Sequence, residues 1–106
     1  MRLYHNPRCS KSRQAMNLLS ERGIEFEEFR YLDRGVHPED VELLSTISGI
    51  IRVSDLDSEA IIDFGDAKAV AELILVNPNI LQRPILISNG VAVIGRPPEN
   101  ILTLLP

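Results

Sequence analysis

Two short apolar runs near the end of the chain constrain its fold more than any other feature. They cover residues 84–88 and 91–95, and Asn89-Gly90 joins them. Asn-Gly is the preferred dipeptide of a two-residue β-hairpin turn, because both of its residues tolerate a positive φ. The sequence therefore predicts two adjacent antiparallel strands, whose open end lies just before residue 84 and just after residue 95.

Strand and helix signals alternate along the rest of the chain. A first strand ends at Tyr4, and a second spans residues 24–31, where a change of parity between Phe26 and Phe29 suggests a β-bulge. Proline, polar N-caps and terminal glycines predict helices over residues 10–23, 37–49, 58–64, 66–76 and from residue 97 onward. Residues 50–58 carry no clear signal.

This order of elements predicts one α/β domain over residues 1–106. Two early strands are joined by a helical crossover, further helices follow, and the hairpin and a last helix end the chain. The pattern is βαβ, then helices, then ββα, and it predicts a mixed four-stranded sheet covered by helices. The thioredoxin fold has the same order, with a reactive cysteine between its first strand and its first helix.

The only cysteine, Cys9, lies in the polar loop before the first helix. Free N–H groups and the helix dipole at a helix N-terminus stabilise an anion, either a thiolate or a bound oxyanion. Four basic side chains surround it: His5, Arg8, Lys11 and Arg13. We therefore expect the pKa of Cys9 to lie below the free value of about 8.5, with Ser12 offering its hydroxyl to the sulfur. A small buried cysteine without a role is the alternative, but it fits a basic loop poorly.

The charge distribution favours a small anionic ligand over a nucleic acid. The formal net charge of −4 argues against a general nucleic-acid binder. All acidic residues nevertheless follow position 20, so a positive pocket can form around Cys9 on an acidic protein. One cysteine with His5 and His37 makes no metal-ligand spacing, and His37 is better explained as a helix cap. We expect no metal centre.

Hydropathy and cysteine content predict a cytoplasmic protein. No apolar run approaches the length of a membrane span, and the N-terminus has no signal-peptide pattern. A single cysteine cannot form an internal disulfide, which fits a reducing compartment.

Two arginines flank the predicted hairpin. Arg83 precedes its first strand and Arg96 follows its second strand, so both side chains come out at the open end of the ladder. If this end faces Cys9, the pocket combines a nucleophile with two planar cations that match a tetrahedral dianion. The alternative for each arginine is a solvent-exposed charge at a strand end.

Several ordered motifs resemble the glutaredoxin-coupled arsenate reductase family. They are Tyr4-His5-Asn6-Pro7-Arg8-Cys9, Ser12-Arg13, Asn77-Pro78, Arg83-Pro84-Ile85 and Gly95-Arg96-Pro97. The resemblance implies a thioredoxin-like fold in which Cys9 attacks arsenate, Arg83 and Arg96 bind the oxyanion, and Pro84 follows a cis peptide bond. It also implies that glutathione and glutaredoxin supply the electrons and that arsenite is released.

The resemblance assigns a third anion-binding arginine to Arg52. No other arginine lies between Gly35 and Gln82, but the acidic neighbours of Arg52 differ from the basic context of the family. His5 and Asn6 are expected either to orient the loop or to support the thiolate. Arg13 either supports the loop or, together with Arg8, belongs to a solvated rim.

The catalytic cycle needs a second thiol from outside this chain. Ser12 stands where a Cys-x-x-Cys loop has its resolving cysteine, and a hydroxyl cannot form a disulfide. We therefore expect glutathione as a co-substrate, a mixed disulfide on Cys9, and no bound cofactor.

The resemblance leaves other functions open. One branch of the family shares the Cys-Ser-Lys-Ser-Arg loop of residues 9–13 and has a physiological substrate that need not be arsenate. Another branch contains transcription regulators that bind RNA polymerase. The chain could thus be a non-catalytic interaction or regulatory module, or a glutathione-dependent thiol oxidoreductase that acts on protein disulfides. Arsenite release from arsenate separates the reductase from these alternatives.

Overall fold

The computed structural model describes residues 1–56 and 63–105, and its centre is one mixed sheet. The sheet has the spatial order β2-β1-β3-β4, with the bounds β1 (Arg2–Tyr4), β2 (Glu27–Phe29), β3 (Ile85–Ser88) and β4 (Val91–Ile94). β1 is parallel to β2 and antiparallel to β3, and β3 is antiparallel to β4. The predicted mixed four-stranded α/β architecture is confirmed, and the β3–β4 hairpin turns at Asn89 and Gly90, both with a positive φ.

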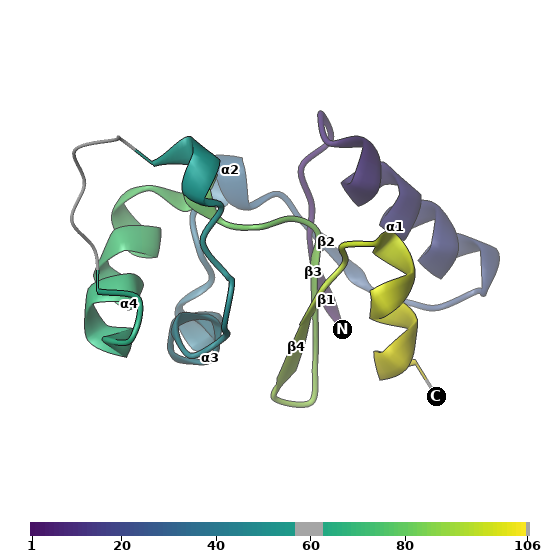
Figure 1. Ribbon diagram of the computed structural model, residues 1–106. Coiled ribbons are helices and arrows are strands. Elements are labelled where there is room, and N and C mark those ends of the chain that lie inside the picture. The colour runs from purple at the N-terminus through teal and green to yellow at the C-terminus, as the bar shows by residue number, and fades with distance from the viewer. Residues whose placement is uncertain (57–62, 106) are drawn as a thin grey trace.

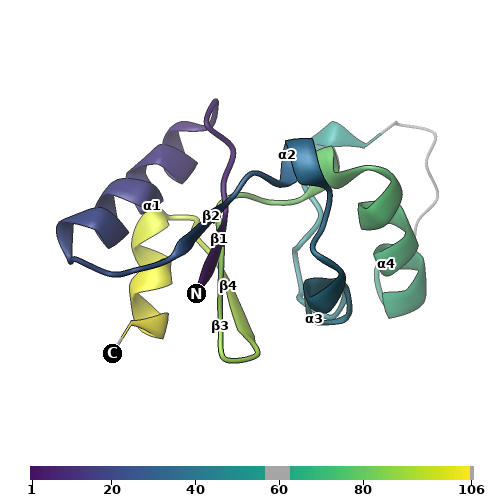
Figure 2. The same ribbon diagram turned by 180° about the vertical axis from the view of Figure 1, so that it is seen from behind.

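Helical layers cover both faces of the sheet (Figure 1, and from behind in Figure 2). On one side lie α1 (Ser10–Glu21) and the 3₁₀ helix η4 (Pro98–Leu104), and on the other lie α3 (Val41–Ser45) and α4 (Ala67–Val76). A hydrophobic core lies on each face of the sheet. Neighbouring residues of β1 pack into different cores, because successive side chains of a strand point to opposite faces. Leu3 packs with the α1 core, and Tyr4 lies in the core beneath α3 and α4.

β2 is shorter than the strand predicted over residues 24–31. Its three residues pair in continuous register with β1, which is itself only three residues long. The change of parity between Phe26 and Phe29 is not a bulge in this pairing. Phe26 packs against the α1 core and Phe29 lies in the opposite core, since side chains three residues apart on an extended chain point to opposite faces.

The segment after β2 contains short helical turns instead of a strand end and one long helix. Tyr31–Arg34 forms the single turn α2, which ends at Gly35 with φ 77°. The helix predicted over residues 37–49 divides into the 3₁₀ turn η1 (Pro38–Asp40) and α3. The His37 Nδ1 atom accepts a hydrogen bond from the Glu39 N–H, so the predicted capping role of His37 is confirmed.

The remaining helices differ from the prediction mainly in type. α4 begins after Asp66, whose carboxylate caps it as predicted, and η4 is a 3₁₀ helix with Ile101 buried against α1. Two 3₁₀ turns, η2 (Val53–Asp55) and η3 (Pro78–Ile80), flank α4 in the chain. The helix predicted over residues 58–64 falls mostly on residues 57–62, outside the described part of the chain. Among the described helices, none combines the length and the apolar character needed to cross a membrane.

Candidate active site

Hydrogen bonds within the loop after β1 hold Cys9 at the start of α1. The Cys9 N–H donates to the Asn6 carbonyl and the Arg8 N–H donates to the Asn6 side-chain oxygen, both at 3.0 Å. The Arg13 guanidinium donates to the Pro7 carbonyl at 2.8 Å. Cys9 is the N-cap residue of α1 and is half-buried. It therefore lies at the positive end of the helix, as predicted.

The Ser12 hydroxyl is directed into the protein, which corrects the expectation that it serves the sulfur. Its Oγ atom lies 2.7 Å from His5 Nδ1 and accepts a hydrogen bond from the Asn6 N–H at 3.0 Å. All three residues are buried, and a buried hydroxyl must find its partners inside the protein. The hydroxyl thus ties α1 to the start of the loop. Burial lowers the pKa of His5, so its ring is neutral at pH 7.

Backbone amides and one arginine act on the Cys9 thiol. Burial raises its pKa, but the N–H groups of Ser12 and Lys11 and the guanidinium of Arg83 stabilise the thiolate and lower the pKa below its ordinary value. Ser12 therefore acts on the sulfur through its backbone. The result is an activated, partly accessible thiol.

We expect Cys9 to react with iodoacetamide at a rate that falls as the pH drops through a pKa below about 8.5. The thiolate is the nucleophile, so the rate reports the thiolate fraction. Arg83→Gln should move the midpoint to higher pH, because it removes a stabilising charge. Arg22→Gln, at the exposed far end of α1, is the matched control and should leave the midpoint in place. A parent midpoint at or above about 8.5 would show that the loop does not activate the thiol.

One isolated β-bridge brings Arg52 and Arg83 together. The bridge joins Ile51 to Leu81, and backbone hydrogen bonds of 2.6 and 2.8 Å flank it. Arg52 directly follows one partner, and Arg83 lies two residues after the other. Both bridge residues are buried in the core beneath α3 and α4, so the two arginines are held by packed backbone.

A surface pocket of about 400 Å³ opens beside Cys9. Its lining includes Cys9, Asn6, Leu32 and the three arginines Arg8, Arg52 and Arg83. The predicted residues Asn6, Arg52 and Arg83 therefore meet at the thiol, and Arg8 adds a third guanidinium. Such a pocket suits an anion, because a planar guanidinium presents N–H groups that match the edges of an oxyanion.

Arg96 lies next to Arg83 but outside this lining. Its guanidinium donates to the Arg83 carbonyl at 3.2 Å, in agreement with the prediction that both positions share the open end of the hairpin. The Arg83–Pro84 peptide bond is cis, as the motif resemblance implies, and so is Arg96–Pro97. Arg96 thus supports the backbone of Arg83, and its direct contact with an anion stays a prediction.

Known proteins are similar to this chain in sequence and in fold. The sequence profile of the ArsC family matches residues 4–104. The chain belongs to the ArsC family. An arsenate reductase of Neisseria meningitidis serogroup A is 42% identical over 116 residues, which cover 99% of this chain and 97% of that protein. The solved structure of an arsenate reductase from Vibrio cholerae has a TM-score of 0.80 at 30% identity, covering 99% of this chain and 98% of that one.

Membership of the ArsC family confirms the resemblance found in the motifs and the thioredoxin-like fold. A more distant relative carries a different name. The global transcriptional regulator Spx of Streptococcus agalactiae is 26% identical over 116 residues, which cover 98% of this chain and 82% of that protein. Proteins similar to this chain in sequence thus include some named as enzymes and one named as a regulator.

Two residues close to Arg83 escape sequence analysis. Asp55 lies between Arg52 and Arg83, and its only sequence signal is an acid three residues after an arginine. The Tyr31 hydroxyl is buried and makes no hydrogen bond to any described residue. Burial raises the pKa of Tyr31 to about 12, although the nearby Arg83 charge opposes this. No local pattern distinguishes Tyr31 from an ordinary core aromatic residue.

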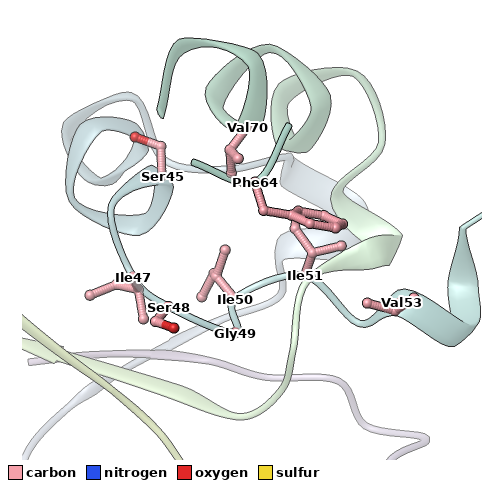
Figure 3. Close-up of a pocket in the computed structure, with 9 residues that line it drawn as sticks. All are labelled: Ser45, Ile47, Ser48, Gly49, Ile50, Ile51, Val53, Phe64 and Val70. Carbon is pink, nitrogen blue, oxygen red and sulfur yellow. The ribbon is translucent and has the colours of Figure 1, made fainter. Parts of the chain in front are cut away.

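A second pocket, of about 210 Å³, lies away from Cys9 beside α3 and α4 (Figure 3). Its lining is mainly apolar and includes Ile47, Ile50, Ile51, Val53, Phe64 and Val70. None of the described residues that line it is ionisable, and the hydroxyls of Ser45 and Ser48 have no acid or base among these residues to activate them. Within residues 1–56 and 63–105, no group of three or more His, Cys, Asp and Glu side chains could hold a metal ion.

Proposed function

We propose that this ArsC-family protein reduces arsenate to arsenite, with Cys9 as the nucleophile. The observation that carries the proposal is the placement of an activated thiol at a helix N-terminus, beside the guanidinium of Arg83 in an arginine-lined pocket. Relatives named arsenate reductase, which the chain matches over nearly its whole length, support arsenate as the substrate.

The first step is attack of the Cys9 thiolate on the arsenic atom of arsenate. A sulfur–arsenic bond forms, and one arsenate oxygen leaves as water after taking up protons from the solvent. Arg83 and Arg52 offset the negative charge of the oxyanion, which would otherwise repel the thiolate. The backbone N–H groups of Lys11 and Ser12 hold the thiolate before attack.

The second step uses glutathione, because Cys9 is the only thiol of the chain. A glutathione thiolate attacks the Cys9 sulfur, and the electron pair of the sulfur–arsenic bond goes to arsenic, which leaves as arsenite. Two sulfurs are oxidised to a mixed disulfide while arsenic(V) is reduced to arsenic(III). Glutaredoxin then removes glutathione from Cys9 and restores the thiol.

Arsenite release tests this proposal directly. The purified protein is incubated with arsenate, glutathione, glutaredoxin, glutathione reductase and NADPH, and both arsenite and NADPH consumption are measured. We expect multiple turnovers that require glutathione. Many turnovers with thioredoxin and no small thiol would contradict the glutathione scheme, and a protein with a reactive Cys9 that forms no arsenite with any donor would contradict the reductase itself.

Arg83→Lys should weaken oxyanion affinity by about ten- to a hundredfold, because lysine keeps the charge but loses the planar fork. Arg96→Lys should have a smaller effect on oxyanion affinity, because the Arg96 guanidinium donates to the Arg83 carbonyl and lies outside the pocket lining. The affinity of the pocket for sulfate is obtained from the sulfate concentration that protects Cys9 against alkylation. Arg22→Lys serves as the control on an exposed arginine. If both site variants bind sulfate and reduce arsenate like the parent, the anion site lies elsewhere.

A second candidate function is a non-catalytic regulatory module. The observation that favours it is the 26% identity to a protein named as a global transcriptional regulator. In this case Cys9 would remain reactive without arsenite formation. Binding of the purified protein to RNA polymerase, compared between the parent and Cys9→Ser, tests this candidate.

A further inference from the structure

Asp55 places a negative charge between the two arginines of the site. Its Oδ2 atom lies 3.2 Å from Nη1 of Arg83 and 3.6 Å from Nη1 of Arg52. The side chain of Asp55 is 25% exposed, that of Arg83 12% and that of Arg52 35%, so water screens the pair of Asp55 and Arg83 less than a surface ion pair and screens Arg52 more. The carboxylate of Asp55 thus forms an ion pair with each of two guanidinium groups.

The hydrogen bonds from the Arg83 guanidinium to described residues all come from one of its nitrogens, Nη1. Nη1 donates to Asp55 at 3.2 Å, to the Asn79 carbonyl at 3.3 Å and to the Leu81 carbonyl at 3.4 Å. Nε is buried and donates to no acceptor among the described residues. A buried N–H without an acceptor is uncommon in folded proteins and points to a missing partner. Arg83 also lines the pocket beside Cys9 and stabilises its thiolate, so Asp55 acts on a guanidinium that borders both the nucleophile and the anion pocket.

We propose that Asp55 is a built-in counter-anion of this pocket, which neutralises part of the charge of Arg52 and Arg83 and thereby sets which oxyanions the pocket accepts. The inference rests on the proposed function, because it concerns the same anion site. With Asp55 ionised, the three side chains of Arg52, Arg83 and Asp55 together carry one net positive charge, whereas the two arginines alone carry two. Since Coulomb energy scales with the charge of the ligand, Asp55 weakens dianion binding more than monoanion binding.

Asp55→Asn isolates this effect, because asparagine is nearly isosteric and its side-chain oxygen can still accept the Nη1 hydrogen bond. The charge is removed while the orientation of Arg83 is kept. Asp33→Asn is the matched control: Asp33 is an exposed carboxylate of α2 that lines a neighbouring pocket, and its substitution changes the net charge by the same amount. Asp55→Ala removes both the charge and the acceptor.

The probes are sulfate, a tetrahedral dianion across the working pH range, and nitrate, a monoanion. Each is titrated at constant ionic strength as a protector of Cys9 against iodoacetamide, and the pH midpoint of the alkylation is recorded without anion. We expect Asp55→Asn to bind sulfate about three- to tenfold more tightly than the parent and to lower the pH midpoint of Cys9. The gain for nitrate should be roughly the square root of the gain for sulfate, and Asp33→Asn should show neither change.

Changes in sulfate affinity and in the Cys9 pH midpoint that run opposite to those expected would overturn the inference. Weaker sulfate protection with a higher Cys9 midpoint in Asp55→Asn would make Asp55 a residue that only positions Arg83, with Asp55→Ala more strongly affected. Equal gains in Asp33→Asn and Asp55→Asn would show a general charge effect, and absence of sulfate protection in both the parent and Asp55→Asn would show that no anion pocket exists for Asp55 to tune. None of these measurements needs turnover, so failure of arsenate reduction alone is distinguished from failure of this inference.

Discussion

Replacing Cys9 by serine should abolish arsenite formation, with a loss of more than about a thousandfold in rate. A serine hydroxyl is not ionised at pH 7, so the helix N-terminus and Arg83 have no anion to activate. The measurement is arsenite release under multiple turnover, combined with mass spectrometry after incubation with arsenate and glutathione. The parent should carry one glutathione on Cys9, and Cys9→Ser should carry none.

Ser10→Ala is the matched control for this substitution. Ser10 is exposed at the start of α1, and its replacement changes the neighbouring residue without touching the thiol. It should retain arsenite formation within a few-fold of the parent. Arsenite formation by Cys9→Ser at the rate of the parent would show that Cys9 is not the nucleophile, and a glutathione adduct elsewhere is ruled out by the single cysteine.

Asp40→Ala should destabilise the fold by about 3 kcal/mol, because it removes the acceptor of two short hydrogen bonds. The Asp40 Oδ2 atom accepts from the Tyr4 hydroxyl and from Nη1 of Arg2, both at 2.7 Å. Tyr4 is fully buried, and its oxygen also accepts from the His37 N–H at 3.0 Å. The substitution leaves the tyrosine hydroxyl proton without a strong acceptor and the arginine without its most buried partner.

Glu27→Ala provides the control for the loss of an ion pair with the same arginine. Glu27 accepts from Nε of Arg2 at 3.2 Å, but its side chain is 46% exposed. Exposed ion pairs contribute little, so we expect a change below about 1 kcal/mol. Urea unfolding of both variants gives the two free energies at 25 °C. A loss for Asp40→Ala that does not exceed the loss for Glu27→Ala would show that the buried network does not stabilise the fold.

Local chemistry along the sequence determined the framework of this protein. Asn89-Gly90 specifies a tight hairpin because only residues that tolerate a positive φ fit its turn. Polar capping at Asp66 begins α4, and the turn at Asn6-Pro7 separates β1 from α1, so Cys9 had to lie at a helix N-terminus. These features depend on residues close together in the chain, and a sequence pattern can therefore predict them.

The tertiary structure alone decided what surrounds the thiol. The Ser12 hydroxyl bonds His5 and the Asn6 amide because burial leaves it no other partners, so it is the backbone N–H of Ser12, and not its hydroxyl, that lowers the pKa of the Cys9 thiol. The approach of Arg52 to Arg83 depends on the bridge between Ile51 and Leu81, thirty residues apart in the chain. No local pattern encodes such a contact, because its energy comes from packing that only the complete core supplies.

The net charge of the pocket beside Cys9 was also decided by the tertiary structure. Asp55 looks in the sequence like one more acid of a polar segment, and its effect arises only because the fold places its carboxylate between two guanidinium groups. Electrostatic energy depends on distance and on exposure to water, and neither quantity can be read from residue order. The sequence therefore determined which groups are available for the chemistry, and the fold decided which charges face them.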